Sequence, residues 1–436
     1  MNSPLPSSKS CNATQGRAAS ARLNILFLTS DKYPPFRPAA KAIFTDEFRL
    51  RGHGVDWLIQ AETIDQAGEV KRDKNGTQYI ASTSAGGSLV SRIGKYVSEF
   101  VNNLRVLYLP FTNQYDLIQV KDRYLSATLA LIVARLTNTP YFHWLAYPHA
   151  EAHALEADQG FARYPFLYRL RAAYQSFLLY KILLKYADHS FVQSEQMKKD
   201  IAEIGIPREK MTAIPGSVTL SEIPFECARG NGSKDVSQES NTEIVLYVGT
   251  LLRERHLEFL IEAFAHTKRR RPNALLRLIG KGENPEDEEL LRNEIARLEL
   301  DDAVEMVGQL TPSAVFPEIA RSQVCVSPYY PSWILNSTSP TKLIEYMAMG
   351  KPVVGNEHPE QSEVIEACGA GLIAPWEEQK FGDCIADLLE MPIKAAEMGL
   401  AGRHWVENNR TNTHLANVVE NTYRRVLANA DTATNS

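Results

Sequence analysis

The residues best suited to chemistry lie in segment 336–354, where a run of serine and threonine residues precedes a helical pattern. Ser339 is predicted to cap this helix, Pro340 to begin its first turn and Gly350 to end it. The free backbone N–H groups and the positive dipole end of a helix N-terminus can hold an anion such as a diphosphate. The segment therefore predicts an anion-binding helix, and a capped surface helix is the alternative.

Three side chains of the same helix add to this predicted site. Thr341 lies at the helix N-terminus, and Lys342 supplies a cation beside it. Glu345 follows Thr341 by four residues on the same helix face, so that its carboxylate can accept hydrogen bonds from hydroxyls such as a ribose diol. We therefore expect Ser339, Thr341, Lys342 and Glu345 to contact a ligand that carries both phosphate and hydroxyl groups.

Further polar residues follow other predicted strands. Gly249 ends one strand, and Arg253 and Arg255 follow it in the loop from which doubly wound sheets bind phosphate, although loop arginines are often only solvated. Gly280 follows another strand in a glycine turn that lacks the full dinucleotide fingerprint, which indicates close backbone approach and no NAD site. Glu360 offers a carboxylate after a third strand. We expect these residues to complete the same site.

The first half of the chain holds a second group of candidates. His149 and Glu151 follow a predicted strand, at a place where a side chain could orient or deprotonate a substrate hydroxyl. Lys121 and Asp122 follow the strand before it. These positions can equally be loop surface or packed strand ends. We expect His149 and Glu151 to act in catalysis, and Lys121 and Asp122 to bind the substrate that carries this hydroxyl.

A scaffold of parallel strands is needed to bring these segments together. Short apolar runs alternate with helical patterns along the chain, which is typical of doubly wound parallel sheets. The predicted strands are 23–28, 55–59, 116–120, 141–146, 190–193, 244–248, 275–279, 304–307, 324–326, 352–354 and 372–374. We therefore predict two facing Rossmann-like α/β domains with a ligand cleft between them, at the carboxyl ends of both sheets.

Length and local composition give the predicted domain boundaries. A chain of 436 residues exceeds what one hydrophobic core usually serves. The stretch CARGNGSKDVSQESNT is polar and predicts an exposed linker. The predicted regions are a disordered tail 1–21, a first domain 22–222, a linker 223–243, a second domain 244–412, a helix 413–428 and a tail 429–436.

Composition and charge exclude several other classes of protein. The chain is 44% hydrophobic and 23% charged, which is ordinary for a soluble globular protein, and its net charge of −5 argues against a nucleic-acid partner. Its five cysteines are scattered without a metal-ligand spacing, which favours a reducing compartment. No signal peptide and no apolar run of about 18 residues are found. We therefore predict a cytoplasmic protein.

The stretch 161–187 is predicted to be helical and contains five basic residues, eight aromatic residues and no acidic residue. This composition suits an anionic membrane surface, or the docking of a lipid-linked substrate. The alternative is a helix packed on the core, with its long cations covering the rim. A core-like apolar stripe favours the alternative and consists of Leu167, Leu170, Tyr174, Phe177 and Leu178. Peripheral contact with the inner face of the membrane stays open.

The segments described above resemble the retaining GT-B glycosyltransferases of family 4. The E-x7-E region of that family is similar to the segment that contains Glu345, which matches the second glutamate. Its Gly-Arg-x4-Lys phosphate clamp is similar to the stretch from Gly249 to Arg255, with Arg255 in the place of the lysine. The N-terminal Pro-Pro loop and the Arg-Gly-His turn at 51–53 also match. The resemblance covers residues 23–427.

The resemblance implies a glycosyltransferase that moves a hexose from an NDP-sugar to a hydroxyl of a saccharide or lipid-linked saccharide, in polysaccharide or cell-surface glycan biosynthesis. It implies acceptor binding by domain 22–222, nucleotide-sugar binding by domain 244–412, and return of helix 413–428 to the first domain. Glu345 would hold the donor ribose, and Arg255 would stabilise the departing diphosphate. Because no Asp-x-Asp motif occurs, we expect no metal and no other cofactor.

This sequence departs from the family pattern at four places. Ser337 stands at the first glutamate, Thr250 at the clamp arginine, and Ala146 where many members carry a histidine. Residues 37–40 read Arg-Pro-Ala-Ala where many members carry paired glycines. These departures keep two alternatives open: a non-catalytic relative that binds nucleotide sugars, and a sugar-nucleotide epimerase on the same fold.

Overall fold

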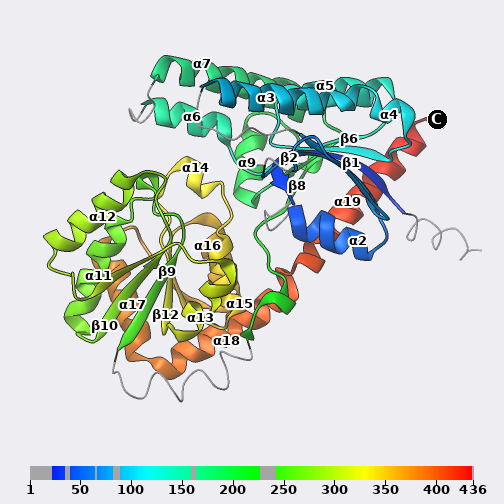
Figure 1. The fold of residues 1–436 in the computed structure, drawn as a ribbon. Coiled ribbons are helices and arrows are strands. Elements are labelled where there is room, and N and C mark those ends of the chain that lie inside the picture. Colours follow the sequence, from blue (N-terminus) through cyan, green and yellow to red (C-terminus); the bar gives the residue numbers. More distant parts are fainter. Residues whose placement is uncertain are drawn as a thin grey trace, which may run out of the picture. The chain divides into compact units, whose positions relative to one another are not determined.

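The computed structural model describes residues 22–34, 40–63, 66–81, 89–158, 164–225 and 242–434. The predicted tail 1–21, most of the predicted linker 223–243 and residues 37–39 of the N-terminal loop lie outside the described residues. The chain divides into two compact units, residues 1–142 and 143–436, and both contain parallel strands covered by helices (Figure 1). Two α/β domains with parallel sheets are thereby confirmed, whereas the predicted domain bounds stay predictions.

The sheet of the first unit has the strand order β3-β4-β2-β1-β5. Its strands are β1 (Asn24–Tyr33), β2 (Gly54–Ala61), β3 (Val70–Asp73), β4 (Gly76–Ala81) and β5 (Leu117–Lys121). Neighbouring strands are parallel except for the antiparallel pair β3 and β4. The helical segments are η1 (Lys41–Glu47), α2 (Phe48–Leu50), α3 (Leu89–Asn103), η3 (Leu104–Leu107), α4 (Leu109–Thr112) and α5 (Leu125–Leu136).

The strand β6 (Tyr141–Leu145) begins in the first unit and ends in the second, where β7 (His189–Val192) and β8 (Met211–Ala213) follow it in the strand order. The helical segments of this part are α6 (His149–Asp158), α7 (Pro165–Ser176), η4 (Phe177–Leu183), α8 (Leu184–Tyr186), α9 (Glu195–Glu203), η5 (Arg208–Lys210) and η6 (Leu220–Glu222). The C-terminal helix α19 (Asn412–Thr434) packs on β7, because the ring of Tyr423 lies 5.5 Å from that of Phe191.

A second sheet in this unit has the order β11-β10-β9-β12-β13-β14, and all its neighbouring strands are parallel. Its strands are β9 (Glu243–Val248), β10 (Ala274–Ile279), β11 (Val304–Gly308), β12 (Val324–Ser327), β13 (Val353–Asn356) and β14 (Gly371–Ala374). The helical segments are η7 (Arg253–Arg255), α11 (Glu258–Arg270), α12 (Pro285–Arg297), α13 (Pro312–Arg321), α14 (Trp333–Asn336), α15 (Thr341–Ala348), α16 (Pro359–Cys368), α17 (Glu378–Glu390) and α18 (Pro392–Asn409).

Two apolar cores lie on opposite faces of this second sheet. Along β9, Val245 and Tyr247 join one core, whereas Leu246 and Val248 join the other, as the two-residue period of a strand requires. The first core also contains buried residues of α11 and α17, and the second contains buried residues of α13 and α15. With both faces covered, the polar loops at the carboxyl ends of the strands remain available for a ligand.

The predicted apolar stripe of stretch 161–187 does not pack on the core. Leu167, Leu170, Tyr174 and Phe177 are exposed by 57%, 59%, 50% and 58%, and only Leu178 of the stripe is buried. The buried face of α7 instead carries Ala172 and Gln175, and η4 buries further leucines. The core-packed interpretation was therefore wrong for α7, although η4 and α8 do bury residues, because a helical period shows that apolar residues share a face but not which face turns inward.

Candidate functional site

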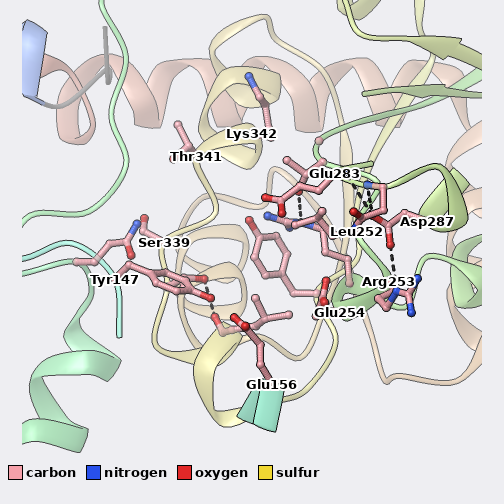
Figure 2. Close-up of a pocket in the computed structure, with 18 residues that line it drawn as sticks. Tyr147, Glu156, Leu252, Arg253, Glu254, Glu283, Asp287, Ser339, Thr341 and Lys342 are labelled. Carbon is pink, nitrogen blue, oxygen red and sulfur yellow. Dashed lines mark hydrogen bonds and ion pairs between the residues drawn. The ribbon is translucent and has the colours of Figure 1, made fainter. Parts of the chain in front are cut away.

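A pocket of about 980 Å³ lies in the second unit, and eight of its lining residues come from the loops after β9 and β10. Other walls are formed by the segments after β6, β7 and β12 and by the N-terminal end of α15. Figure 2 shows Thr341 and Lys342 on one side of it, and Glu156 and Glu254 on another. Of the predicted donor residues, six line the pocket: Gly249, Arg253, Arg255, Ser339, Thr341 and Lys342.

Arg255 is the cation of this pocket whose charge no carboxylate balances within the described part of the chain. It ends the short helix η7, where His256 adopts a left-handed backbone conformation with a φ of 50°. Its Nε donates a hydrogen bond of 2.7 Å to Oγ1 of Thr250, and its guanidinium lies 5.4 Å from the centre of the Tyr329 ring. Thr250, at the place of the family's clamp arginine, therefore helps to hold Arg255 toward the pocket.

Arg253 and Lys342 differ from Arg255 because each has an acidic partner. Arg253 Nε donates to Asp287 Oδ1 over 3.1 Å, and Asp287 also completes the capping box of α12. Burial alone would raise the pKa of Asp287, but hydrogen bonds from the backbone and from Arg253 lower it. Lys342 Nζ lies 2.6 Å from Glu345 Oε2, and Glu345 is not among the lining residues.

The N-terminal end of α15 differs by one residue from the prediction. The N-cap is Pro340, which offers no side-chain cap, and the helix begins at Thr341. Ser339 was wrongly predicted as the cap, because its hydroxyl group is used by tertiary partners. Its Oγ donates to Glu360 Oε1 over 2.7 Å and accepts from the backbone N–H of Gly216 over 2.7 Å. The first backbone N–H groups of α15 are thus left without a side-chain cap.

Glu360 and Gly280 lie outside the pocket lining and shape the loops around it. Glu360 accepts hydrogen bonds from Ser339 and from Arg410, whose Nη1 is 2.9 Å away. Burial raises the pKa of Glu360, and the charge of Arg410 partly offsets this effect. Gly280 has a φ of 155°, and a Cβ atom there would lie 1.7 Å from the carbonyl oxygen of Gly249. The close backbone approach expected at Gly280 is thus made to another loop of the chain.

Of the predicted catalytic residues, Arg255 lines the pocket, whereas His149, Glu151 and the predicted acceptor residues do not. His149 is the first residue of α6, and its ring lies 5.0 Å from that of Tyr147. One oxygen of Glu151 accepts a hydrogen bond of 2.5 Å from the hydroxyl group of Tyr180. In the first unit, Lys121 Nζ forms a buried ion pair with Asp31, 2.9 Å away. Its neighbour Asp122 has a left-handed φ of 52°.

Several lining residues were not predicted from the sequence. They are polar or aromatic residues at the ends of strands or in helices, and the main ones are Tyr147, Glu156, Gln193, Glu254, Glu283 and Tyr329. Burial raises the pKa of Glu156, and the charges of Glu254 and Glu283 raise it further. Gln193 and Tyr329 follow strands β7 and β12, so the strand-end rule that selected Lys121 applies to them as well.

The described residues offer neither a metal-binding cluster nor a membrane-spanning helix. Within the described residues, no group of three or more His, Cys, Asp or Glu side chains is placed to hold a metal ion. None of the described helices combines the length and the apolar character that a membrane crossing requires. The expectation that no metal is needed stays a prediction.

Comparisons with known proteins agree with this architecture. The family model of group 1 glycosyl transferases matches residues 231–405, and the model of the glycosyl transferase 4-like domain matches residues 47–216. A search of curated protein sequences finds no match.

Solved structures share the fold over nearly the whole chain. Sucrose-phosphate synthase from Thermosynechococcus elongatus has a TM-score of 0.69 at 19% identity and covers 93% of this chain and 99% of its own. Trehalose 6-phosphate synthase from Burkholderia multivorans has a TM-score of 0.69 at 15% identity, with 95% and 99% covered. HepE from Anabaena, in complex with UDP and glucose, has a TM-score of 0.62 at 16% identity, with 92% and 99% covered. With its pocket, its two parallel-sheet domains and these family models, the chain belongs to the group 1 glycosyltransferases, enzymes of the GT-B type.

Proposed function

We propose that this enzyme moves a hexose from a nucleoside diphosphate sugar to a hydroxyl of a saccharide or lipid-linked saccharide, with retention of configuration and without a metal ion. The proposal rests on one observation: which cations of the pocket already form an ion pair with a carboxylate and which do not. Arg255 has no carboxylate partner within the described residues, and it lines the same pocket as the uncapped N-terminus of α15. A guanidinium and free helix amides suit the two phosphate groups of a diphosphate. The UDP in the HepE complex supports the same ligand class.

The proposed reaction breaks the bond between the anomeric carbon and the diphosphate oxygen and forms a bond from that carbon to the acceptor oxygen. Arg255 and the amides of α15 stabilise the negative charge that grows on the departing diphosphate, and Lys342 adds to this once it leaves Glu345. The proton of the acceptor hydroxyl passes to a phosphate oxygen on the same face of the sugar. This front-face route gives retention without a carboxylate nucleophile, and trapping a covalent glycosyl-enzyme would contradict it.

The donor test combines binding with turnover. Calorimetric titrations with UDP and GDP identify the base, and a panel of nucleotide sugars is then assayed for transfer and for hydrolysis. We expect one nucleoside diphosphate to bind and its sugar conjugate to be consumed. Tight binding without turnover across the panel would favour the non-catalytic relative. Conversion of one nucleotide sugar to its epimer without added acceptor would favour the epimerase.

The exposed apolar face of α7 suggests where the acceptor is located. Phe166 is exposed by 76% and extends the apolar face that includes Leu167, Leu170 and Phe177. The described stretch 164–187 carries Arg169, Arg171, Lys181 and Lys185 and no acidic residue. Apolar side chains flanked by cations suit the surface of an anionic bilayer. The proposal therefore includes peripheral contact with the cytoplasmic face of a membrane that carries the acceptor, in polysaccharide or cell-surface glycan synthesis.

Co-sedimentation with vesicles tests this contact. We expect binding to vesicles that contain phosphatidylglycerol, weaker binding to pure phosphatidylcholine, and loss of binding in the double variant Phe166→Ser, Phe177→Ser. Ile393, exposed by 78% on α18, provides the matched control Ile393→Ser, which should bind as the wild type does. Equal binding of the double variant and the wild type would refute the contact.

A further inference from the structure

The side chain of Gln193 presents an unused hydrogen-bond acceptor to the pocket region. Gln193 directly follows β7 and is one of the residues that line the pocket. Its Oε1 is buried and has no hydrogen-bond partner within the described residues. A buried amide oxygen without a partner is unfavourable, so a position of this kind points to a donor that the ligand supplies.

The turn that carries Gln193 is held firmly in place. The next residue, Ser194, caps α9 by accepting a hydrogen bond of 3.0 Å from the backbone N–H of Met197. The hydroxyl group of Ser194 also donates to the carbonyl oxygen of Ser337 over 2.7 Å. The first bond fixes the turn at the start of α9, and the second attaches it to the loop before α15, so that Gln193 is positioned relative to the N-terminus of that helix.

The other hydroxyl groups on this wall already have partners. Ser337 donates to Asp200 Oδ2 over 2.5 Å and does not line the pocket. Thr338 donates to the carbonyl oxygen of Leu335 over 2.7 Å, and Ser339 is held by Glu360 and Gly216. Among the residues that line the pocket, Gln193 is the one with a buried side-chain acceptor that no group of the described chain satisfies, because Glu360, whose Oε2 is also unpartnered, lies outside the lining.

The part of the ligand that contacts the Gln193 oxygen must carry a hydrogen-bond donor. A diphosphate carries acceptor oxygens and no hydrogen-bond donor when fully ionised, so it cannot satisfy an amide oxygen. The hydroxyl groups of a sugar are donors. We infer that the amide oxygen of Gln193 accepts a hydrogen bond from one hydroxyl group of the transferred hexose. It would thus supply a contact that Ser337, whose hydroxyl group is turned toward α9, cannot make. This inference rests on the proposed function and deepens it, because it makes Gln193 a specificity-determining residue for the donor sugar.

The test compares a nucleotide with its sugar conjugate. Gln193→Ala and Gln193→Met are titrated calorimetrically with UDP and UDP-glucose, and with GDP and GDP-mannose. We expect the affinity for the nucleotide to change less than twofold and that for the sugar conjugate to fall about tenfold, as for one lost hydrogen bond to a buried group. Met keeps a similar length without a good acceptor. Gln379→Ala, at an exposed position of α17, is the matched control and should change neither affinity.

Deoxy analogues of the bound sugar nucleotide identify the hydroxyl group. In the wild type, one analogue should lose about as much affinity as the Gln193→Met variant loses with the intact sugar. In Gln193→Met, that analogue and the intact sugar should bind equally, because the partner is gone. Equal weakening of nucleotide and sugar conjugate would show that the amide serves the nucleotide part of the ligand, such as its ribose hydroxyls or its base, and would overturn the inference. If the wild type binds neither nucleotide, the proposed function itself fails.

Discussion

Replacement of Arg255 by alanine should weaken binding of the nucleoside diphosphate more than any other single change in the pocket. The Nε of the guanidinium donates to Thr250, and the hydroxyl groups of Tyr247 and Tyr329 also lie within hydrogen-bonding reach of it, so a phosphate group would compete with neutral hydroxyls and not with a carboxylate. A hydrogen bond to a charged group contributes about 1.5–3 kcal/mol. Within the described chain, Arg255 forms no ion pair with a carboxylate that the phosphate group would have to displace. A loss of about 2–3 kcal/mol corresponds to a Kd that rises by roughly 30- to 150-fold.

The assay is calorimetric titration of wild type and variants with the nucleoside diphosphate that binds, at one fixed ionic strength. Arg255→Lys keeps the charge without the planar fork, so its Kd should fall between those of wild type and Arg255→Ala. Arg253→Ala should have a smaller effect on Kd, because Asp287 already compensates that charge. Arg292→Ala, on the exposed surface of α12, is the control for loss of a cation in general. A Kd for Arg255→Ala within threefold of wild type would refute the placement of the diphosphate.

The remaining predictions concern pH, backbone and core. Burial lowers the pKa of His143 to about 3 and those of His189 and His358 to about 4. The unfolded chain binds these protons near pH 6.5, so the free energy of unfolding should fall as pH drops from 6.5 toward 4, by up to about 3 kcal/mol for each histidine. Urea titrations across this range should show the slope, and His358→Asn, which retains an N-cap, should reduce it; a flat profile would contradict the assignment. Gly280→Ala should destabilise the fold by at least about 3 kcal/mol or prevent folding, because of its positive φ and the Gly249 carbonyl. Gly94→Ala, where a Cβ meets no atom, should leave stability equal or slightly raised, and thermal unfolding compares the two. Lys121→Met should cost about 3–5 kcal/mol, since it removes the cation that lies 2.9 Å from the buried carboxylate of Asp31, and an unchanged melting temperature would count against that buried ion pair.

The strands could be predicted because both faces of each sheet are covered. Runs such as residues 25–28 and 244–248 are almost continuously apolar, and the structure forms strands there. The hairpin of β3 and β4 was missed, although Asn75 in the connection and Gly76 at the start of β4 form an Asn-Gly turn signal. The strand β8 was missed because three residues are too few for a pattern.

The sequence predicted the positions of several site residues along the strands, but not the groups that each side chain contacts. Strand-end positions selected Arg255 and Lys121 by the same rule, and the structure places Lys121 at the end of β5 and Arg255 in the segment after β9. Lys121 is neutralised by Asp31, which is 90 residues away in sequence, whereas Arg255 has a hydroxyl and rings beside it. Ser339 likewise finds Glu360 and Gly216 in place of its own helix. Such partners come from tertiary structure, and the local pattern does not contain them.

The charges of the pocket explain how one ligand can be held in a single orientation. The lining contains Arg253, Arg255 and Lys342, but also four carboxylates, so the pocket as a whole is not positive. The carboxylates of Glu156 and Glu254 lie near each other, since the charge of Glu254 raises the pKa of Glu156, and they are apart from Lys342 in Figure 2. A diphosphate is repelled by this acidic part and attracted to Arg255 and α15, whereas hydroxyl groups can donate to carboxylates. A diphosphate that draws Lys342 away from Glu345 would also free that carboxylate for a ribose. Phosphate binding and hydroxyl recognition would then depend on each other. Removal of the Glu345 carboxylate should therefore lower the affinity for UDP, whereas the affinity for pyrophosphate should stay unchanged or rise.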